Sequence, residues 1–186
     1  MELSRSVVER KAREYERVEP LYEREREHLA SFPAAFESGE YGWKDAEWVV
    51  RWYFRRYLGA YPHDDRTAIE AAFGENDHSA VERAIETALG ADTLDAKLRA
   101  LIALSGVDVA VASAFLLFVD PERYLVVGDR EWGVLRTAGE LDDPYPDPPA
   151  VADYGGYLTT VRSLAERFDC TLWELYRCLW RLGAET

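Results

Sequence analysis

Asp129 is the residue whose type and position most favour chemistry. It follows an apolar run at residues 124–127 and opens an expected helix over residues 130–135. An ionised carboxylate there can stabilise positive charge that develops as a bond breaks, as at the anomeric carbon of a sugar, or it can orient an attacking water. Aspartate before a helix is also an ordinary N-cap. The two roles are compatible, so both interpretations of Asp129 stay open.

The other reactive side chains form no recognisable site. His63 and His78 are expected in surface loops, and the spacing of the sequence supplies no third ligand for a metal ion. Cys170 and Cys178 lack the accompanying histidines of a zinc site, and we interpret them as reduced thiols. The sequence therefore predicts no metal site and no cofactor.

A helical hairpin is expected to position Asp129. Apolar residues at helical spacing, with Asp92 or Thr93 as N-cap, predict a helix over residues 93–104. Residues 105–108 then form a tight turn, and residues 110–119 form a second, almost wholly apolar helix. Small side chains in the first half of that helix let the two backbones approach closely. The sequence thus predicts an antiparallel helical hairpin.

The hairpin carries a family resemblance. Residues 104–112, Leu-Ser-Gly-Val-Asp-Val-Ala-Val-Ala, resemble the L-P-G-V-G-x-x-x-A hairpin of the helix-hairpin-helix DNA glycosylase superfamily. In that superfamily an essential aspartate follows the hairpin after a second helix and a short apolar run, which is the position of Asp129. The resemblance covers residues 92–135 and is closest to small members that share the D-P-E-R-Y segment. It implies an all-α, glycosylase-like fold and excision of bases from DNA.

The resemblance also implies roles for the residues around the hairpin. Asp129 would stabilise the cationic sugar as the base leaves. A base flipped out of the duplex would stack on Trp52 or Trp132. A DNA phosphate would be held by the backbone of five turn residues: Ser105, Gly106, Val107, Asp108 and Val109.

Departures from the family pattern narrow these implications. Asp108 stands where the family has glycine, so its charge would oppose phosphate binding, although aspartate tolerates the left-handed backbone of a turn. Ala110 stands where bifunctional members carry a Schiff-base lysine, which leaves a monofunctional enzyme. The four-cysteine iron–sulfur cluster of some members is absent. Two alternatives stay open: a non-catalytic nucleic-acid-binding module, and a degenerate member acting as an interaction protein.

Further helices are expected around the hairpin. Residues 1–38 are interpreted as an N-terminal helical arm divided by Pro20, ending in a linker over residues 31–42, and residues 39–186 as a single helical domain. The last helix, over residues 172–182, is expected to bury four side chains: Trp173, Tyr176, Leu179 and Trp180. The predicted architecture is all-α.

A strip of arginines, Arg51, Arg55 and Arg56, lies on the helix expected at residues 45–58. These cations could contact phosphates, or they could pair with some of the many carboxylates of the chain.

The composition is strongly acidic. The chain has 35 Asp and Glu against 22 Lys and Arg, a net charge of −13, and all but three of the basic residues are arginine. Scarce lysine with abundant acid resembles proteins of halophilic organisms, whose acidic surfaces keep them in solution. The charge therefore weakens the case for a DNA partner without removing it.

The longest apolar run, residues 109–119, is too short to span a membrane. We expect a cytoplasmic protein with DNA as its partner and no membrane association.

Overall fold

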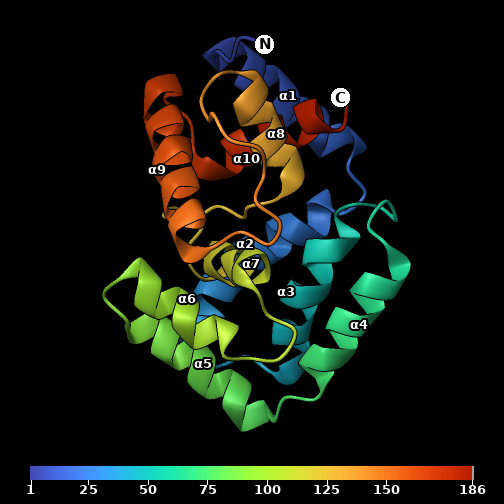
Figure 1. The fold of residues 1–186 in the computed structure, drawn as a ribbon, viewed down its shortest axis with the longest axis vertical. Coiled ribbons are helices and arrows are strands. Elements are labelled where there is room, and N and C mark those ends of the chain that lie inside the picture. Colours follow the sequence, from blue (N-terminus) through green and yellow to red (C-terminus); the bar gives the residue numbers. More distant parts are fainter. Residues whose placement is uncertain (186) are drawn as a thin grey trace.

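The computed structural model describes residues 1–185, and within them the chain forms ten α-helices and no strand, which confirms the all-α prediction. Figure 1 shows α7 near the centre, with α1, α8, α9 and α10 above it and α3 to α6 below. The helices are α1 (Arg5–Val18), α2 (Tyr22–Ser38), α3 (Trp43–Arg55), α4 (His63–Gly74), α5 (His78–Gly90), α6 (Leu94–Ile102), α7 (Val109–Val119), α8 (Asp129–Thr137), α9 (Val151–Phe168) and α10 (Leu172–Gly183).

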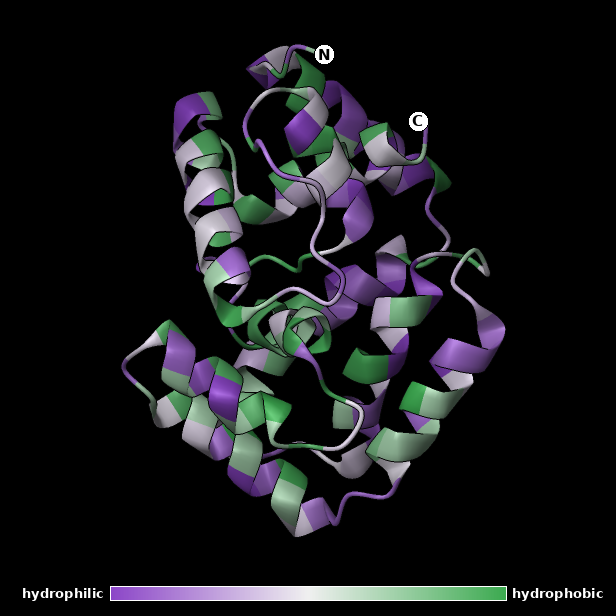
Figure 2. Cartoon of the chain, viewed as in Figure 1, coloured by the Kyte–Doolittle hydropathy of each residue, from purple (hydrophilic) through white to green (hydrophobic). Residues whose placement is uncertain are grey.

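The predicted hairpin is formed by α6 and α7. Thr93 caps α6 by accepting a hydrogen bond from the amide of Ala96 at 3.2 Å. Nearly all of α7 is buried, and it packs against α2, α3, α6 and α9. Figure 2 shows it as the hydrophobic centre of the molecule. Because α7 is apolar on every side, it can be stable only where other helices surround it.

The turn between α6 and α7 docks on α4. Gly106 has a φ of +75°, and a Cβ there would lie 2.6 Å from the carbonyl oxygen of Ile69 and 2.7 Å from the amide nitrogen of Phe73. Only glycine fits that approach. The side chain of Asn76 closes the contact by accepting from the Ser105 amide and donating to the Ser105 carbonyl, each at 3.0 Å.

Asp108 is not the left-handed residue of the turn. Its backbone is extended (φ −94°, ψ −174°), and its carboxylate caps α7 by accepting from the amide of Val111 at 2.8 Å. The left-handed position belongs to Gly106. An aspartate is therefore favoured at residue 108 for the same reason that it is favoured at any helix start.

The apolar run at residues 124–127 is extended and buried but has no partner strand within residues 1–185. Its carbonyls accept hydrogen bonds from tyrosine hydroxyls instead: Tyr154 donates to Leu125 at 3.0 Å and Tyr157 to Val126 at 2.9 Å. The amide of Val127 donates to Ser113 Oγ of α7 at 3.0 Å. Side chains thus satisfy the backbone that leads into Asp129.

The N-terminal segment belongs to the same core as the rest of the chain. The break at Pro20 is confirmed, since α1 ends at Val18 and α2 begins at Tyr22. The linker predicted for residues 31–42 is wrong, because α2 continues through Pro33 to Ser38. Phe32 and Phe36 on this stretch are buried, and their packing outweighs the helix hydrogen bond that proline cannot make.

At the other end of the chain, α10 packs along α1. Thr171 and Glu174 form the capping box that begins α10. Tyr176, Leu179 and Trp180 are buried as predicted, whereas Trp173 is only half-buried. Among residues 1–185, no helix is both long enough and apolar enough to cross a membrane.

Candidate active-site pocket

A small pocket joins four separate parts of the chain beside Asp129. It has a volume of about 110 Å³ and lies where α3, the start of α7, the start of α8 and the loop before α9 meet. We call it the four-tyrosine pocket. Its lining residues are Tyr53, Tyr57, Tyr61, Asp108, Ala110, Asp129, Tyr145 and Asp147.

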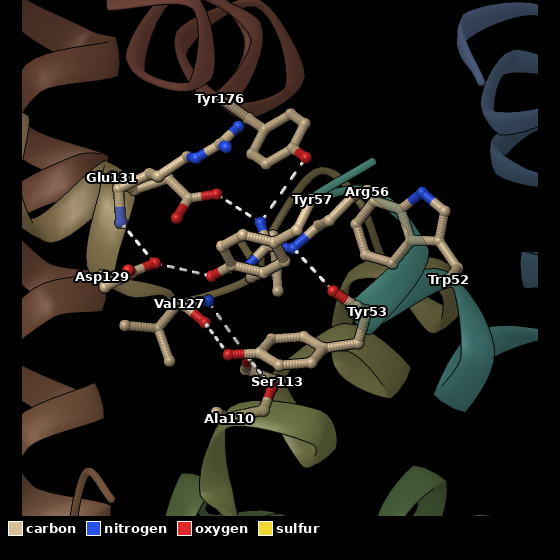
Figure 3. A network of polar contacts seen from close by, with 12 residues as sticks. Trp52, Tyr53, Arg56, Tyr57, Ala110, Ser113, Val127, Asp129, Glu131 and Tyr176 are labelled. Carbon is tan, nitrogen blue, oxygen red and sulfur yellow. Dashed lines mark hydrogen bonds and ion pairs between the residues drawn. The ribbon is translucent and has the colours of Figure 1, made fainter. Parts of the chain in front are cut away.

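Asp129 is the first residue of α8, and the preceding Gly128 occupies the N-cap position that the sequence suggested for Asp129. One carboxylate oxygen, Oδ1, accepts from the Tyr57 hydroxyl at 2.7 Å and from the Arg130 amide at 2.8 Å (Figure 3). The residue is exposed, and Oδ2 accepts no hydrogen bond within residues 1–185. One oxygen therefore orients the group while the other is open to a ligand.

A buried ion pair lies directly behind Tyr57. Arg56 is paired with Glu131, and both side chains are fully enclosed. Arg56 also donates to the Tyr57 hydroxyl at 3.4 Å, and its guanidinium lies 4.7 Å from the ring centre of Tyr53 and 4.8 Å from that of Trp180. Figure 3 shows the contacts running from Glu131 through Arg56 and Tyr57 to Asp129.

Gly128 makes this arrangement possible. A Cβ at residue 128 would overlap Arg56 Nη2 and would lie 2.7 Å from Glu131 Oε2 and 2.8 Å from the Tyr57 hydroxyl. Glu131 Oε2 is buried and has no hydrogen-bond partner among residues 1–185, and burial raises the pKa of this carboxyl above its ordinary value. Any larger residue at 128 would push apart the groups that hold Asp129.

The pocket is aromatic and acidic. The rings of Tyr57 and Tyr61 are 5.6 Å apart, and the Tyr53 hydroxyl donates to the carbonyl of Val127 at 3.3 Å. Burial raises the pKa of Tyr53, which keeps its hydroxyl protonated. The three carboxylates of the pocket are all exposed: Asp108, Asp129 and Asp147. No lysine or arginine is among the lining residues.

The residues predicted to contact DNA are partly brought to this pocket. Asp108 lines it, and Ser105 is exposed on the far side of the turn facing Asn76. The amides of Ser105 and Val107 are engaged by Asn76 and by the Leu104 carbonyl at 3.2 Å. Within residues 1–185, the amides of Gly106, Asp108 and Val109 donate to no protein acceptor.

The two predicted base-stacking tryptophans do not line the pocket. Trp52 is buried, donates to Glu25 Oε1 at 2.8 Å and packs edge-on against Phe118. Trp132 is buried, donates to the Asp143 carbonyl at 2.9 Å and stacks on Tyr157. In this conformation, the rings beside Asp129 are tyrosines.

Those tyrosines were missed at the sequence level. Tyr53 and Tyr57 are four residues apart, a spacing that puts two side chains on one side of a helix, whereas Tyr61 reaches the pocket only because the chain reverses after α3. The fold also separates the three arginines of the predicted strip. Arg51 pairs with Glu47 at 2.8 Å, and Arg56 turns into the core. Of the three, Arg55 alone is exposed and has no ion pair with residues 1–185.

The remaining reactive residues lie away from the pocket. His63 and His78 are exposed, but each begins a helix rather than lying in a loop. Burial raises the pKa of Cys170 to about 11 and that of Cys178 to about 12, so both are protonated thiols near neutral pH. Within residues 1–185, no group of three metal-ligating side chains is arranged to hold an ion.

Comparison with models of protein families, with curated proteins and with solved structures finds no match to this chain.

Proposed function

We propose that this protein is a monofunctional base-excision enzyme of the helix-hairpin-helix DNA glycosylase type. One observation carries the proposal: an open, oriented carboxylate, Asp129, borders an aromatic pocket that also includes the start of α7. That helix start holds Asp108 and Ala110, the two positions that the family resemblance makes functional. Asp129 and these two residues, which lie far from it in the sequence, line the same pocket.

In this proposal the pocket receives a base extruded from the duplex. Extrusion costs a few kcal/mol, which stacking on the tyrosine rings offsets. A volume of about 110 Å³ is smaller than the roughly 150 Å³ cavity that takes up benzene, so in this proposal the pocket widens to admit even a single-ring base. The sugar of that nucleotide would then lie at the pocket mouth, beside Asp129.

Asp129 would act on the sugar rather than on the base. As the glycosidic bond breaks, positive charge grows at the anomeric carbon, and a fixed carboxylate lowers the energy of that state. The hydrogen bonds from Tyr57 and Arg130 hold Oδ1, which leaves Oδ2 to face the cationic centre or to orient water. Because residue 110 is alanine, water and not a protein amine completes the reaction.

A second candidate function follows from the charges of the pocket. Three exposed carboxylates and four tyrosines, with no cation among the lining residues, also suit an ammonium or guanidinium group. Under this candidate the chain is an interaction protein that captures a lysine or arginine side chain of a partner.

The test is release of free base by wild type and by Asp129→Asn, from duplexes carrying oxidised, alkylated or deaminated bases, at low and at molar salt. Asparagine keeps the shape of the side chain and an acceptor for Tyr57 and Arg130 but removes the charge. Base release should fall by orders of magnitude, since an oriented charge typically contributes a few kcal/mol to lowering the barrier, while binding persists. Neither protein should cleave the strand through a Schiff base.

The matched control is Asp95→Asn, which neutralises another exposed aspartate in the first turn of a helix, far from the pocket. It should release base at the wild-type rate. If wild type releases no base from any duplex, the enzyme proposal is wrong. Binding to duplexes without release would then favour the nucleic-acid-binding module, and binding of lysine- or arginine-rich peptides lost in Asp129→Asn would favour the interaction protein.

A further inference from the structure

A second hollow lies on the other side of Tyr61 from the four-tyrosine pocket. It has a volume of about 200 Å³ and is formed by the end of α3, the connection to α4 and the first turn of α4. We call it the cationic hollow. Its lining residues are Phe54, Arg55, Gly59, Tyr61, His63 and Arg66. Tyr61 lines both cavities.

The charge of this hollow is opposite to that of the pocket. Half of its lining residues are basic, and no carboxylate is among them. Arg55 is exposed and has no ion-pair partner within residues 1–185. Arg66 donates toward His63 Nδ1 at 3.2 Å, and it forms an ion pair with Glu70 at 3.6 Å. In a chain of net charge −13, both arginines therefore line a hollow that has no carboxylate in its lining.

A reversal of the chain after α3 forms this hollow. Leu58 and Gly59 both have positive φ, 51° and 90°, so the chain reverses within a few residues of the end of α3. A left-handed leucine is strained, and such strain persists only where surrounding contacts hold it. The reversal brings Tyr61 and the start of α4 back beside Arg55. Asp64 and Asp65 follow in the first turn of α4 but do not line the hollow.

We propose that the cationic hollow binds a phosphate of a nucleic-acid strand, next to the nucleotide whose base enters the four-tyrosine pocket. The planar fork of arginine matches the oxygens of a phosphate, so a hollow lined by two arginines suits that anion. The hairpin is a weaker site, because Asp108 repels anions and Asn76 occupies the Ser105 amide. This inference rests on the proposed function only in taking nucleic acid as the ligand.

The experiment measures binding of a fluorescent single-stranded oligonucleotide by anisotropy over a series of salt concentrations. The variant is Arg55→Gln with Arg66→Gln. For single strands, log K falls with log salt at a slope of about −0.7 per phosphate contact. Loss of two contacts should therefore make the slope shallower by about 1.4 and weaken binding at low salt at least about tenfold. Thermal melting checks that the variant is folded.

The control is Arg24→Gln with Arg26→Gln, which removes the same charge from an exposed face of α2. Its salt slope should match that of wild type. Equal slopes for the hollow variant and the control, or no binding of the oligonucleotide by wild type, would overturn the proposal. Failure of base excision is a separate outcome. If wild type binds the oligonucleotide with a salt slope that depends on Arg55 and Arg66 but releases no base, the phosphate site is supported and the proposed enzyme activity is refuted.

Discussion

Glu25 should make the stability of this protein depend on pH. Its carboxylate is fully buried and accepts hydrogen bonds from the Tyr15 hydroxyl at 2.7 Å and from Trp52 Nε1 at 2.8 Å. Through these contacts it links α2 to α1 and α3. Two hydrogen bonds favour the ionised form, but burial in an apolar site outweighs them and raises the pKa of Glu25 from 4.5 to about 7.

The raised pKa of Glu25 makes the protein less stable as the pH rises. Because the folded protein holds the proton of Glu25 more tightly than the unfolded chain does, the contribution of Glu25 to the free energy of unfolding is greatest below about pH 4.5. It falls as the pH rises toward about 7 and is constant above that. One pKa unit corresponds to about 1.4 kcal/mol, so the loss across this window is about 3 kcal/mol.

The perturbation is Glu25→Gln, which has nearly the same shape and cannot ionise. Its carbonyl can accept from Trp52, and its amide can donate to the Tyr15 oxygen. We expect the variant to match wild type near pH 4.5 and to exceed its free energy of unfolding by about 3 kcal/mol at pH 8. Urea unfolding at a series of pH values measures both proteins, and the difference between them cancels other groups such as Glu131. A difference that does not change between pH 4.5 and 8, or that grows toward acid, would refute the reasoning.

Two further predictions concern the core and the hairpin. Trp180 is buried and lies against the guanidinium of Arg130 at 4.3 Å, so Trp180→Ala should destabilise the fold by about 3 to 5 kcal/mol in chemical unfolding; a variant that unfolds like wild type would show that α10 packs differently. Asp108→Asn should keep the cap on α7, since asparagine caps as well as aspartate, and should tighten binding to duplex DNA by removing a repulsive charge. Unchanged affinity, beside an unchanged Asp95→Asn control, would mean that the hairpin does not approach a phosphate.

Local patterns in the sequence predicted the helices well. The hairpin of α6 and α7, the cap at Thr93 and the capping box at Thr171 all agree with the structure. Each depends on interactions between residues three or four apart, which are present whatever the rest of the chain does. The prediction failed where distant packing competes with a local preference, as at Pro33, where the burial of Phe32 and Phe36 keeps α2 continuous.

The composition of the candidate site was decided by tertiary structure. Asp129 and Asp108 could be singled out from the sequence because each stands at the start of an expected helix. Nothing local distinguishes Arg56, which turns inward to Glu131, from Arg55, which stays exposed one residue earlier. Likewise, only the packing of α3 against α7, and the contact of Tyr57 with the start of α8, put tyrosines beside Asp129 and leave Trp52 in the core. Periodicity along a helix fixes which residues share a face, but the partner that covers that face comes from segments far away in the chain.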